Sequence, residues 1–399
     1  MTAVAEHQPL EPFKLERFFA KYEFTTPHLA CCSDVEPLML SELLAYGDDD
    51  ALQRWASLRL SYTETQGLPA LRQAIANKLY SHISPEQLVV LAPEEGVYLT
   101  MRALLQPGDQ VVVQYPGYQS LYAVAQSMGC QVLRWEPRLV PDTAQCVFDV
   151  SSLKGLLSPS TKMVVVNFPH NPTGAVLDLP DWQQLLGACE AAGCWLFSDE
   201  MYRTLELDPS RRPPNAADSY PKAISLAGCS KALALPGLRL GWLACQDAAL
   251  LQRVMELKDY TTICAAAPSE VLALMAVRAM DSIVARSMAI IRDNIADFQA
   301  LQNQHPGIFQ WTPPAAGSVA FPRLMTGEPI DLFCDRLAAA EGVLLLPASV
   351  YDHDPSTAAG HFRLGLGRKN FKDCMARLAA FLERERADIS GAVGAPAPS

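Results

Sequence analysis

Short apolar runs alternate with helix-like segments through the middle of the chain, and this alternation constrains the fold more than any other feature. The runs rich in β-branched residues are LVVLAP, QVVVQYPGY, CQVLRWE, KMVVVNF, CWLFSDE, AISLAG and GWLAC, in chain order. Amphipathic segments such as LPDWQQLLGACEAAG separate most of them. This pattern predicts an α/β fold with a mostly parallel central sheet and helices on both faces. In such sheets, ligands bind outside the carboxyl ends of the strands.

The length of the chain predicts a second, smaller domain. With 399 residues, 50% of them hydrophobic, the chain can bury a large core and a smaller one. A long helical pattern over 268–304 links the large domain to a remainder that reads as α+β. We therefore expect a large domain over 46–285, a small domain from 1–45 and 286–386, and a disordered Gly/Pro-rich tail over 387–399.

Composition narrows the class of partner. The net charge of −11 and a pI near 5.2 argue against nucleic-acid binding, which favours basic faces. The 11 cysteines show neither CxxC pairs nor metal-ligand spacing, which indicates a reduced protein with no metal site. No signal peptide and no membrane-spanning apolar run is present, so we expect a cytoplasmic protein that does not bind a membrane.

A lysine and an arginine stand eight positions apart in SLAGCSKALALPGLRLGW. Lys231 follows small residues ending in Ser230, and Arg239 lies between two glycines. A partly desolvated lysine can attack a carbonyl, and an arginine suits a phosphate. Pyridoxal phosphate (PLP) carries both an aldehyde and a phosphate. Two surface residues beside a turn are the alternative.

Polar residues stand where strands of the predicted sheet end. Asp199 ends one strand, and it can either pair with a pyridine nitrogen or cap a helix. Asn171 lies in a turn sequence, and its amide can donate to a phenolic oxygen, as can the hydroxyl of Tyr202. Tyr118 can stack on a pyridine ring. For Tyr202, a half-buried aromatic with no such role is the alternative.

Arg363 lies in a short apolar run, where a buried guanidinium requires a partner. A substrate carboxylate would supply that partner through two parallel hydrogen bonds. An internal salt bridge is the alternative, and Arg323 and Arg368 are rivals for the same role.

Taken together, these segments resemble the class I/II aminotransferase family of fold-type I PLP enzymes over about residues 30–385. The matching pieces are YTETQGLPALRQAIA, LLQPGDQVVVQYPGY, NFPHNPTG, SDEMYR, SKALALPGLRLGW and HFRLGLGR. The resemblance points to a divergent subgroup that includes cyclases similar to capreomycidine synthase. It implies amino acid and 2-oxo acid substrates and a homodimer.

The resemblance also assigns roles. It implies an aldimine on Lys231, a pyridine-nitrogen contact for Asp199, phenolic-oxygen contacts for Asn171 and Tyr202, and stacking by Tyr118. Ser230 and Arg239 would hold the phosphate, and Arg363, with Asn171, would bind the substrate. Tyr62 would reach the phosphate of a neighbouring subunit. Besides Lys231 and Asp199, the site residues that the resemblance implies are therefore Asn171, Tyr202, Tyr118, Ser230, Arg239, Arg363 and Tyr62.

Two departures from the family pattern affect the phosphate site. Ala92-Pro93-Glu94 stands where Gly-Ala-Ser/Thr is usual, and Gly228 replaces a serine three positions before the lysine. The backbone amides of Glu94 and Glu95 at a helix start can still bind the anion. The segment SDVEPLMLSELL also replaces a Gly-Glu-Pro type entry on the substrate side.

Amino-group transfer is the leading prediction for the reaction. Elimination or cyclisation of an arginine-like or hydroxylated amino acid by the same cofactor is the second. A non-catalytic PLP-binding regulatory module is a remote third, because no helix-turn-helix pattern precedes the domain.

Overall fold

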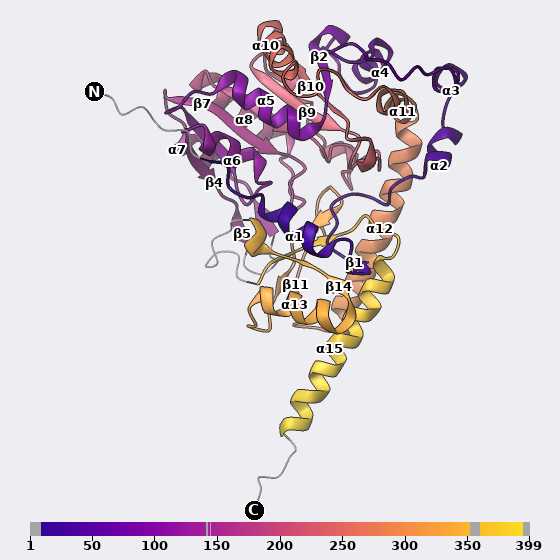
Figure 1. Cartoon of the computed structure of the whole chain (residues 1–399). Helices are drawn as coiled ribbons and strands as arrows, with labels where there is room; N and C mark the ends of the chain where they lie inside the picture. The colour runs from indigo at the N-terminus through magenta and orange to yellow at the C-terminus, as the bar shows by residue number, and fades with distance from the viewer. Residues whose placement is uncertain (1–8, 141–142, 144, 352–359, 394–399) are drawn as a thin grey trace, which may run out of the picture.

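A seven-stranded sheet forms the centre of the computed structural model (Figure 1), which describes residues 9–140, 143, 145–351 and 360–393, with side chains up to residue 385. In spatial order its strands are β2 (Leu88–Leu91), β10 (Gly241–Cys245), β9 (Ala223–Gly228), β8 (Trp195–Asp199), β7 (Thr161–Asn167), β3 (Gln110–Gln114) and β4 (Gln131–Trp135). Of these seven strands, β10 alone runs in the opposite direction to the others, so the predicted mostly parallel α/β architecture is confirmed.

Helices cover both faces of the sheet because successive strand residues point to opposite sides. Val111 and Val113 face one layer of helices, and Val112 faces another. The first layer is α5 (Pro93–Leu104), α6 (Ser120–Ser127) and α10 (Ala248–Lys258). The second is α7 (Val150–Leu156), α8 (Leu179–Ala192), α4 (Pro69–Leu79) and α11 (Ala267–Arg278).

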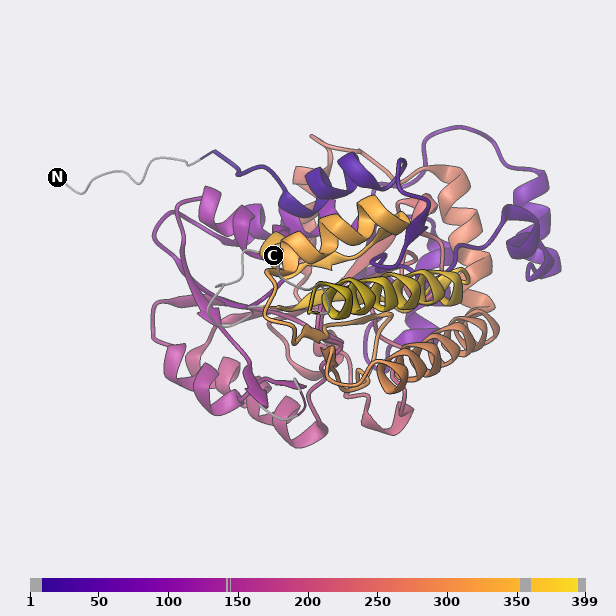
Figure 2. The same cartoon turned by 90° about the horizontal axis from the view of Figure 1, so that it is seen from below.

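The rest of the chain builds small sheets and helices beside the carboxyl end of the large sheet. Its strands are β1 (His28–Leu29) with β14 (Val343–Leu344), β11 (Phe309–Gln310) with β13 (Arg323–Leu324), and β12 (Val319–Ala320), β16 (Phe362–Gly365) and β15 (Leu346–Pro347) in one sheet. Its helices include α12 (Met280–Gln304), α13 (Ile330–Glu341) and α15 (Phe371–Val393). Helices α12 and α15 lie side by side (Figure 2).

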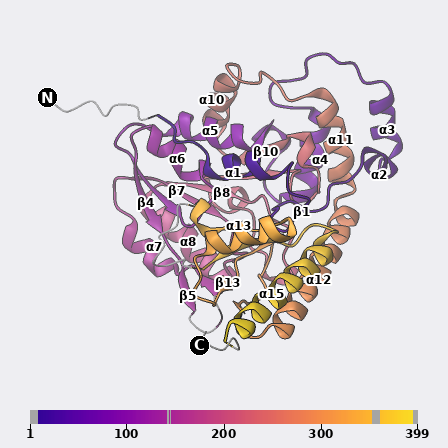
Figure 3. The same cartoon turned by 60° about the horizontal axis from the view of Figure 1, so that its bottom comes forward.

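The spacing of Phe13, Phe18, Phe19 and Tyr22 predicts a helix over residues 12–24, and the structure confirms one there, α1 (Lys14–Tyr22). It lies between the large sheet and α13 (Figure 3), and it packs against the short helix η4 (Ala348–Tyr351). Two further short helices, α2 (Leu40–Ala45) and α3 (Asp49–Ala56), precede α4.

Two elements differ from the sequence prediction. The continuous helical pattern of 268–304 is interrupted at Ala279, where φ of −93° and ψ of 12° end α11 before α12 begins. Helix α15 continues past residue 387, where the sequence predicted a disordered tail, because no proline lies between Phe371 and Pro396 and the helical hydrogen bonds can continue. Residues 394–399 lie outside the described residues, and the domain boundaries at 46 and 286 stay a prediction.

Within the described residues, no helix combines the length and apolar composition needed to cross a membrane.

Candidate active site

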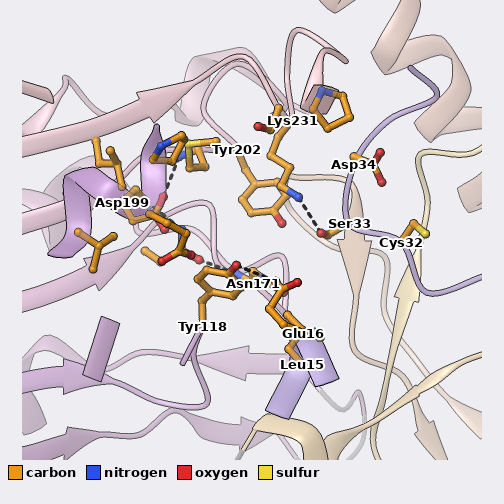
Figure 4. Close-up of a pocket in the computed structure, with 18 of the residues that line it drawn as sticks. Leu15, Glu16, Cys32, Ser33, Asp34, Tyr118, Asn171, Asp199, Tyr202 and Lys231 are labelled. Carbon is orange, nitrogen blue, oxygen red and sulfur yellow. Dashed lines mark hydrogen bonds between the residues drawn. The ribbon is translucent and has the colours of Figure 1, made fainter. Parts of the chain in front are cut away.

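The carboxyl ends of the central strands open into a cavity of about 420 Å³ (Figure 4). Asn167 and Asp199 are paired residues at the ends of β7 and β8, so their loops emerge at the same edge. Eight of the predicted site residues line this cavity: Lys231, Asp199, Tyr202, Asn171, Tyr118, Ser230, Arg239 and Glu94. Parallel strand order therefore gathers side chains that are far apart in the sequence.

Lys231 follows β9 in a tight turn of small residues. A Cβ atom at Gly228 would lie 3.2 Å from both the Cα of Gly241 and the carbonyl oxygen of Leu240, so the close backbone approach favours glycine there. The Nζ of Lys231 donates a hydrogen bond of 2.8 Å to the Oγ of Ser33. Burial lowers the pKa of Lys231, while Asp34 partly opposes that shift. A lysine in this setting loses its proton more readily than a surface lysine.

Asp199 is a buried carboxylate at the end of β8, and its side chain makes few compensating contacts. Its Oδ1 accepts a hydrogen bond of 3.0 Å from the backbone N–H of Met201. Burial raises the pKa of Asp199 to about 7, Glu94 adds to the shift, and Lys231 opposes it. A cationic partner in the cavity would restore the ordinary charge of this carboxylate.

Asn171 and Tyr202 contribute polar groups from two different loops. The Oδ1 of Asn171 accepts hydrogen bonds from the Tyr351 hydroxyl at 2.9 Å and the Arg363 Nη1 at 3.4 Å. This engagement of Oδ1 leaves the Nδ2 group of Asn171 as its donor. Burial raises the pKa of Tyr202 to about 12, so its hydroxyl keeps its proton near neutral pH.

The phosphate side contains cationic, hydroxyl and helix N-terminal groups together with a carboxylate. Arg239 has left-handed backbone geometry, with φ of 50°, between two glycines. Helix α5 begins at Pro93, and Glu94 in its first turn faces the cavity. The Oε1 of Glu94 accepts a hydrogen bond of 3.3 Å from the Ser120 hydroxyl. Burial raises the pKa of Glu94, which favours the neutral form and weakens its repulsion of an anion.

Two predicted cofactor residues lie outside this cavity. Glu95 points to a neighbouring depression, where its Oε1 accepts hydrogen bonds from the hydroxyls of Thr261 and Thr262, the latter at 2.8 Å. Tyr62 lines the same depression with Arg239 and is 84% exposed. Adjacent residues of a helix point in different directions, which explains why Glu94 and Glu95 separate.

Arg363, the predicted substrate ligand, lies on β16 and is fully buried beside the cavity rather than in its lining. Its Nε donates to the Cys31 carbonyl at 2.9 Å, and its Nη1 donates to the Tyr351 hydroxyl at 2.6 Å. Its Nη2 has no hydrogen-bond partner within the described part of the chain. The N–H groups of Nη2 therefore remain for an anionic ligand.

The two rival arginines are placed elsewhere. Arg368 donates to both carboxylate oxygens of Asp34, at 2.9 and 3.0 Å. Arg323 lies on β13 and forms an isolated bridge with His361. Neither lines the cavity.

The sequence did not reveal that α1 forms part of the cavity wall. The residues it missed are Leu15, Glu16, Phe19 and Glu23 of that segment, with Cys32, Ser33 and Asp34. The spacing of Phe13, Phe18, Phe19 and Tyr22 predicted a helix, but it contained no signal for where the helix docks.

The cavity fits pyridoxal 5'-phosphate on two observations from its own residues. Asp199 is a buried carboxylate that lacks a cation, and a protonated pyridine nitrogen is such a cation. Lys231 is a partly buried amine of lowered pKa at the other side of the same space. With the seven-stranded sheet, this arrangement defines the class of protein as a PLP-dependent enzyme of fold type I.

The chain belongs to the aminotransferase class I and II family, and the sequence model of that family matches residues 50–370. Capreomycidine synthase from Streptomyces vinaceus is 31% identical over 350 residues, which covers 86% of each chain. Arginine–pyruvate transaminase from Pseudomonas aeruginosa is 30% identical over 369 residues, 84% of this chain and 88% of that one.

Solved structures agree with this assignment. A PLP-dependent aminotransferase from Streptococcus suis superposes with a TM-score of 0.86 at 28% identity, covering 94% of this chain and 99% of the other. A PLP-dependent cyclase, OrfR, superposes with a TM-score of 0.84 at 29% identity, covering 96% and 99%. The predicted family, fold type and cofactor are therefore confirmed.

Proposed function

We propose that this enzyme transfers the amino group of an amino acid to a 2-oxo acid, with Lys231 as the residue that binds the cofactor and moves the proton. The observation that carries this proposal is the pairing, in one cavity, of a lysine of lowered pKa with the buried carboxylate of Asp199. The first loses its proton more readily than an ordinary lysine and can then act as a base, and the second stabilises a cation.

Bound PLP supplies an aldehyde that holds the amino group and a ring that withdraws electrons from it. Lys231 Nζ, once neutral, would take the α-proton of the amino acid and return it to the carbon that the cofactor aldehyde contributes. Asp199 would hold the proton on the ring nitrogen, because its buried carboxylate would gain a cationic partner there. Asn171 and Tyr202 would donate to the phenolic oxygen, and Tyr118 would stack on the ring.

Separate groups of the protein would hold the phosphate of the cofactor and the carboxylate of the substrate. Arg239, Ser230 and the first N–H groups of α5, at Glu94 and Glu95, would bind the phosphate. Arg363 would bind the substrate carboxylate through Nη2, the atom without a described partner, and Asn171 would support it from the same side.

We propose a homodimer in which Tyr62 reaches the phosphate of the partner subunit. Tyr62 is 84% exposed, and it lines one depression with Arg239. Leu60 and Tyr260 are also large apolar side chains left 85% and 90% exposed. Exposed apolar groups beside a ligand site favour coverage by another chain.

Cyclisation or elimination is a second candidate that uses the same residues. Two similar proteins are named capreomycidine synthase and PLP-dependent cyclase, which supports it. Transamination converts the cofactor to its pyridoxamine form in the first half-reaction and back to the aldehyde in the second. A cyclase or lyase would release product without that conversion.

Borohydride reduction followed by peptide mass spectrometry tests the assignment of Lys231. We expect one phosphopyridoxyl adduct on the peptide that contains Lys231, and none in Lys231→Ala. Amino acids are then added singly while the cofactor absorbance is followed, and the 2-oxo acid produced is measured. An adduct on another lysine would refute the assignment. An aldimine-type absorbance without product from any amino acid would favour the non-catalytic module instead.

A further inference from the structure

Helix α1 and the residue after it turn one face into the cavity, and none of these side chains has a role in the proposed reaction. Glu16, Phe19 and Glu23 all line the cavity. They are spaced three and seven positions from the first, so a helix brings them to one side. The face that lines the cavity is therefore an aromatic ring with a carboxylate before it and another after it.

Contacts on both sides of the cavity fix the position of this face. The Phe13 ring lies 5.0 Å from the Tyr118 ring, measured between centroids. Gln119 donates to the Pro12 carbonyl at 3.1 Å and accepts from the backbone N–H of Lys14 at 2.8 Å. Leu15 is buried in the cluster that contains Tyr351. The helix is thus held against residues of the large sheet and of η4 together.

Negative charge exceeds positive charge along the cavity wall. Among the described residues that line the cavity, Lys231 and Arg239 are cationic, whereas the carboxylates are those of Glu16, Glu23, Asp34, Glu94 and Asp199. Three of the five carboxylates are accounted for by other parts of the site. Asp199 would face the ring nitrogen in the proposed function, Asp34 pairs with Arg368, and Glu94 lies on the phosphate side in the first turn of α5.

Glu16 and Glu23 have neither a cationic partner among the described residues nor a place in the proposed cofactor site. Glu16 Oε1 accepts a hydrogen bond of 3.2 Å from the Tyr118 hydroxyl, and neither glutamate forms an ion pair with any residue the structure describes. Burial and the nearby Asp34 raise the pKa of Glu23, which shows that this carboxylate lies where a further cation would stabilise its charged form.

The same face covers the end of the site where the substrate carboxylate would bind. The Phe19 ring lies 5.7 Å from the guanidinium carbon of Arg363. An amino acid held by Arg363 therefore lies next to α1, within reach of carboxylates on either side of Phe19.

We propose that the substrate is an amino acid with a cationic side chain, and that Glu16 and Glu23 bind its guanidinium or ammonium group. This inference rests on the proposed function, because it takes Arg363 as the ligand of the α-carboxylate. It makes α1 the element that determines specificity.

The test uses the PLP-loaded, full-length enzyme and matched pairs of amino acids. L-Arginine is compared with its neutral isostere L-citrulline, and L-lysine with L-norleucine. The readout is the concentration that gives half of the cofactor absorbance change, which reports binding whether or not the cofactor turns over. The variants are Glu16→Gln, Glu23→Gln and the double variant. Glu11→Gln is the control, because Glu11 is exposed just before α1 and does not line the cavity.

We expect at least one cationic amino acid to bind about tenfold or more tightly than its neutral partner. Loss of a charged hydrogen bond typically costs about 10- to 100-fold, so the double variant should lose that preference while its response to the neutral partner changes less than about twofold. Glu11→Gln should behave as the unsubstituted enzyme.

Equal responses to charged and neutral partners, or equal losses for both in the double variant, would overturn the inference. If leucine or aspartate converts the cofactor while no cationic amino acid does, the proposed function stands and the inference fails. If no amino acid changes the absorbance, both fail.

Discussion

Asp199→Asn should stabilise the cofactor-free protein while it damages the enzyme. Asp199 is 7% exposed, and burial is the main cause of its raised pKa. Asparagine has nearly the same shape, and its carbonyl can keep the hydrogen bond from Met201 N–H, which Asp199 accepts at 3.0 Å. The substitution therefore removes a buried charge without opening a cavity.

The pKa sets both the size and the pH window of this effect. The pKa of Asp199 is raised from 3.8 to about 7. At about 1.4 kcal/mol for each pH unit, this shift destabilises the folded state by about 4 kcal/mol when the carboxylate is ionised. The penalty is absent below about pH 4, grows as the pH rises, and is complete above about pH 7. The advantage of Asp199→Asn should follow the same course.

Urea unfolding of the cofactor-free protein at fixed protein concentration measures the difference. We expect Asp199→Asn to exceed the unsubstituted protein by a few kcal/mol at pH 8 and by much less at pH 5. Asp149→Asn is the control of opposite sign, because hydrogen bonds from Ser151 lower the pKa of Asp149 and its contribution is lost as the pH falls. With PLP and substrate, Asp199→Asn should lower kcat by roughly 100-fold or more. Equal stability at pH 8, or an advantage that grows toward pH 5, would refute the reasoning.

Three further substitutions test other parts of the site. Tyr62→Phe should weaken PLP binding about tenfold in titrations, yet leave unfolding unchanged because the side chain is 84% exposed; unchanged affinity would exclude the contact across the dimer. Gly228→Ser, although it adds the hydroxyl usual in the family, should lower the free energy of unfolding in urea by about 1–3 kcal/mol, because its Cβ would lie 3.2 Å from the Cα of Gly241. Arg363→Lys should raise KM for amino acids about 30- to 150-fold, since the planar fork is lost, whereas Arg323→Lys should change it less than twofold; similar KM values for both would contradict the role of Arg363.

The large sheet and most of its polar edge could be predicted because both follow from local patterns. β-Branched runs fixed the strands, and the common direction of parallel strands then placed Asp199 and Asn171 at one edge. Strand direction itself is not encoded in a short apolar run. The antiparallel pairing of β10 with β9 therefore could not be foreseen from GWLAC.

The contribution of α1 could not be predicted because docking depends on partners far away in the chain. Lys14 and Gln119 are 105 positions apart, yet their hydrogen bond sets where the helix lies. The separation of Glu94 from Glu95 was more accessible, since neighbouring residues on a helix cannot share one face. Burial of Arg363 behind Tyr351 again required tertiary contacts.

The charged groups of the site contribute little to the stability of the cofactor-free protein, because they are buried without complementary partners among the described residues. Asp199 and Lys231 both have pKa values shifted toward their neutral forms by burial, and Arg363 has an Nη2 without a described partner. Each would gain a partner of complementary chemistry from PLP or from a substrate carboxylate. Ligands that bind only the folded state stabilise it in proportion to the logarithm of their concentration over Kd. The same unpaired groups that weaken the cofactor-free fold therefore supply the free energy with which it holds its cofactor and substrate.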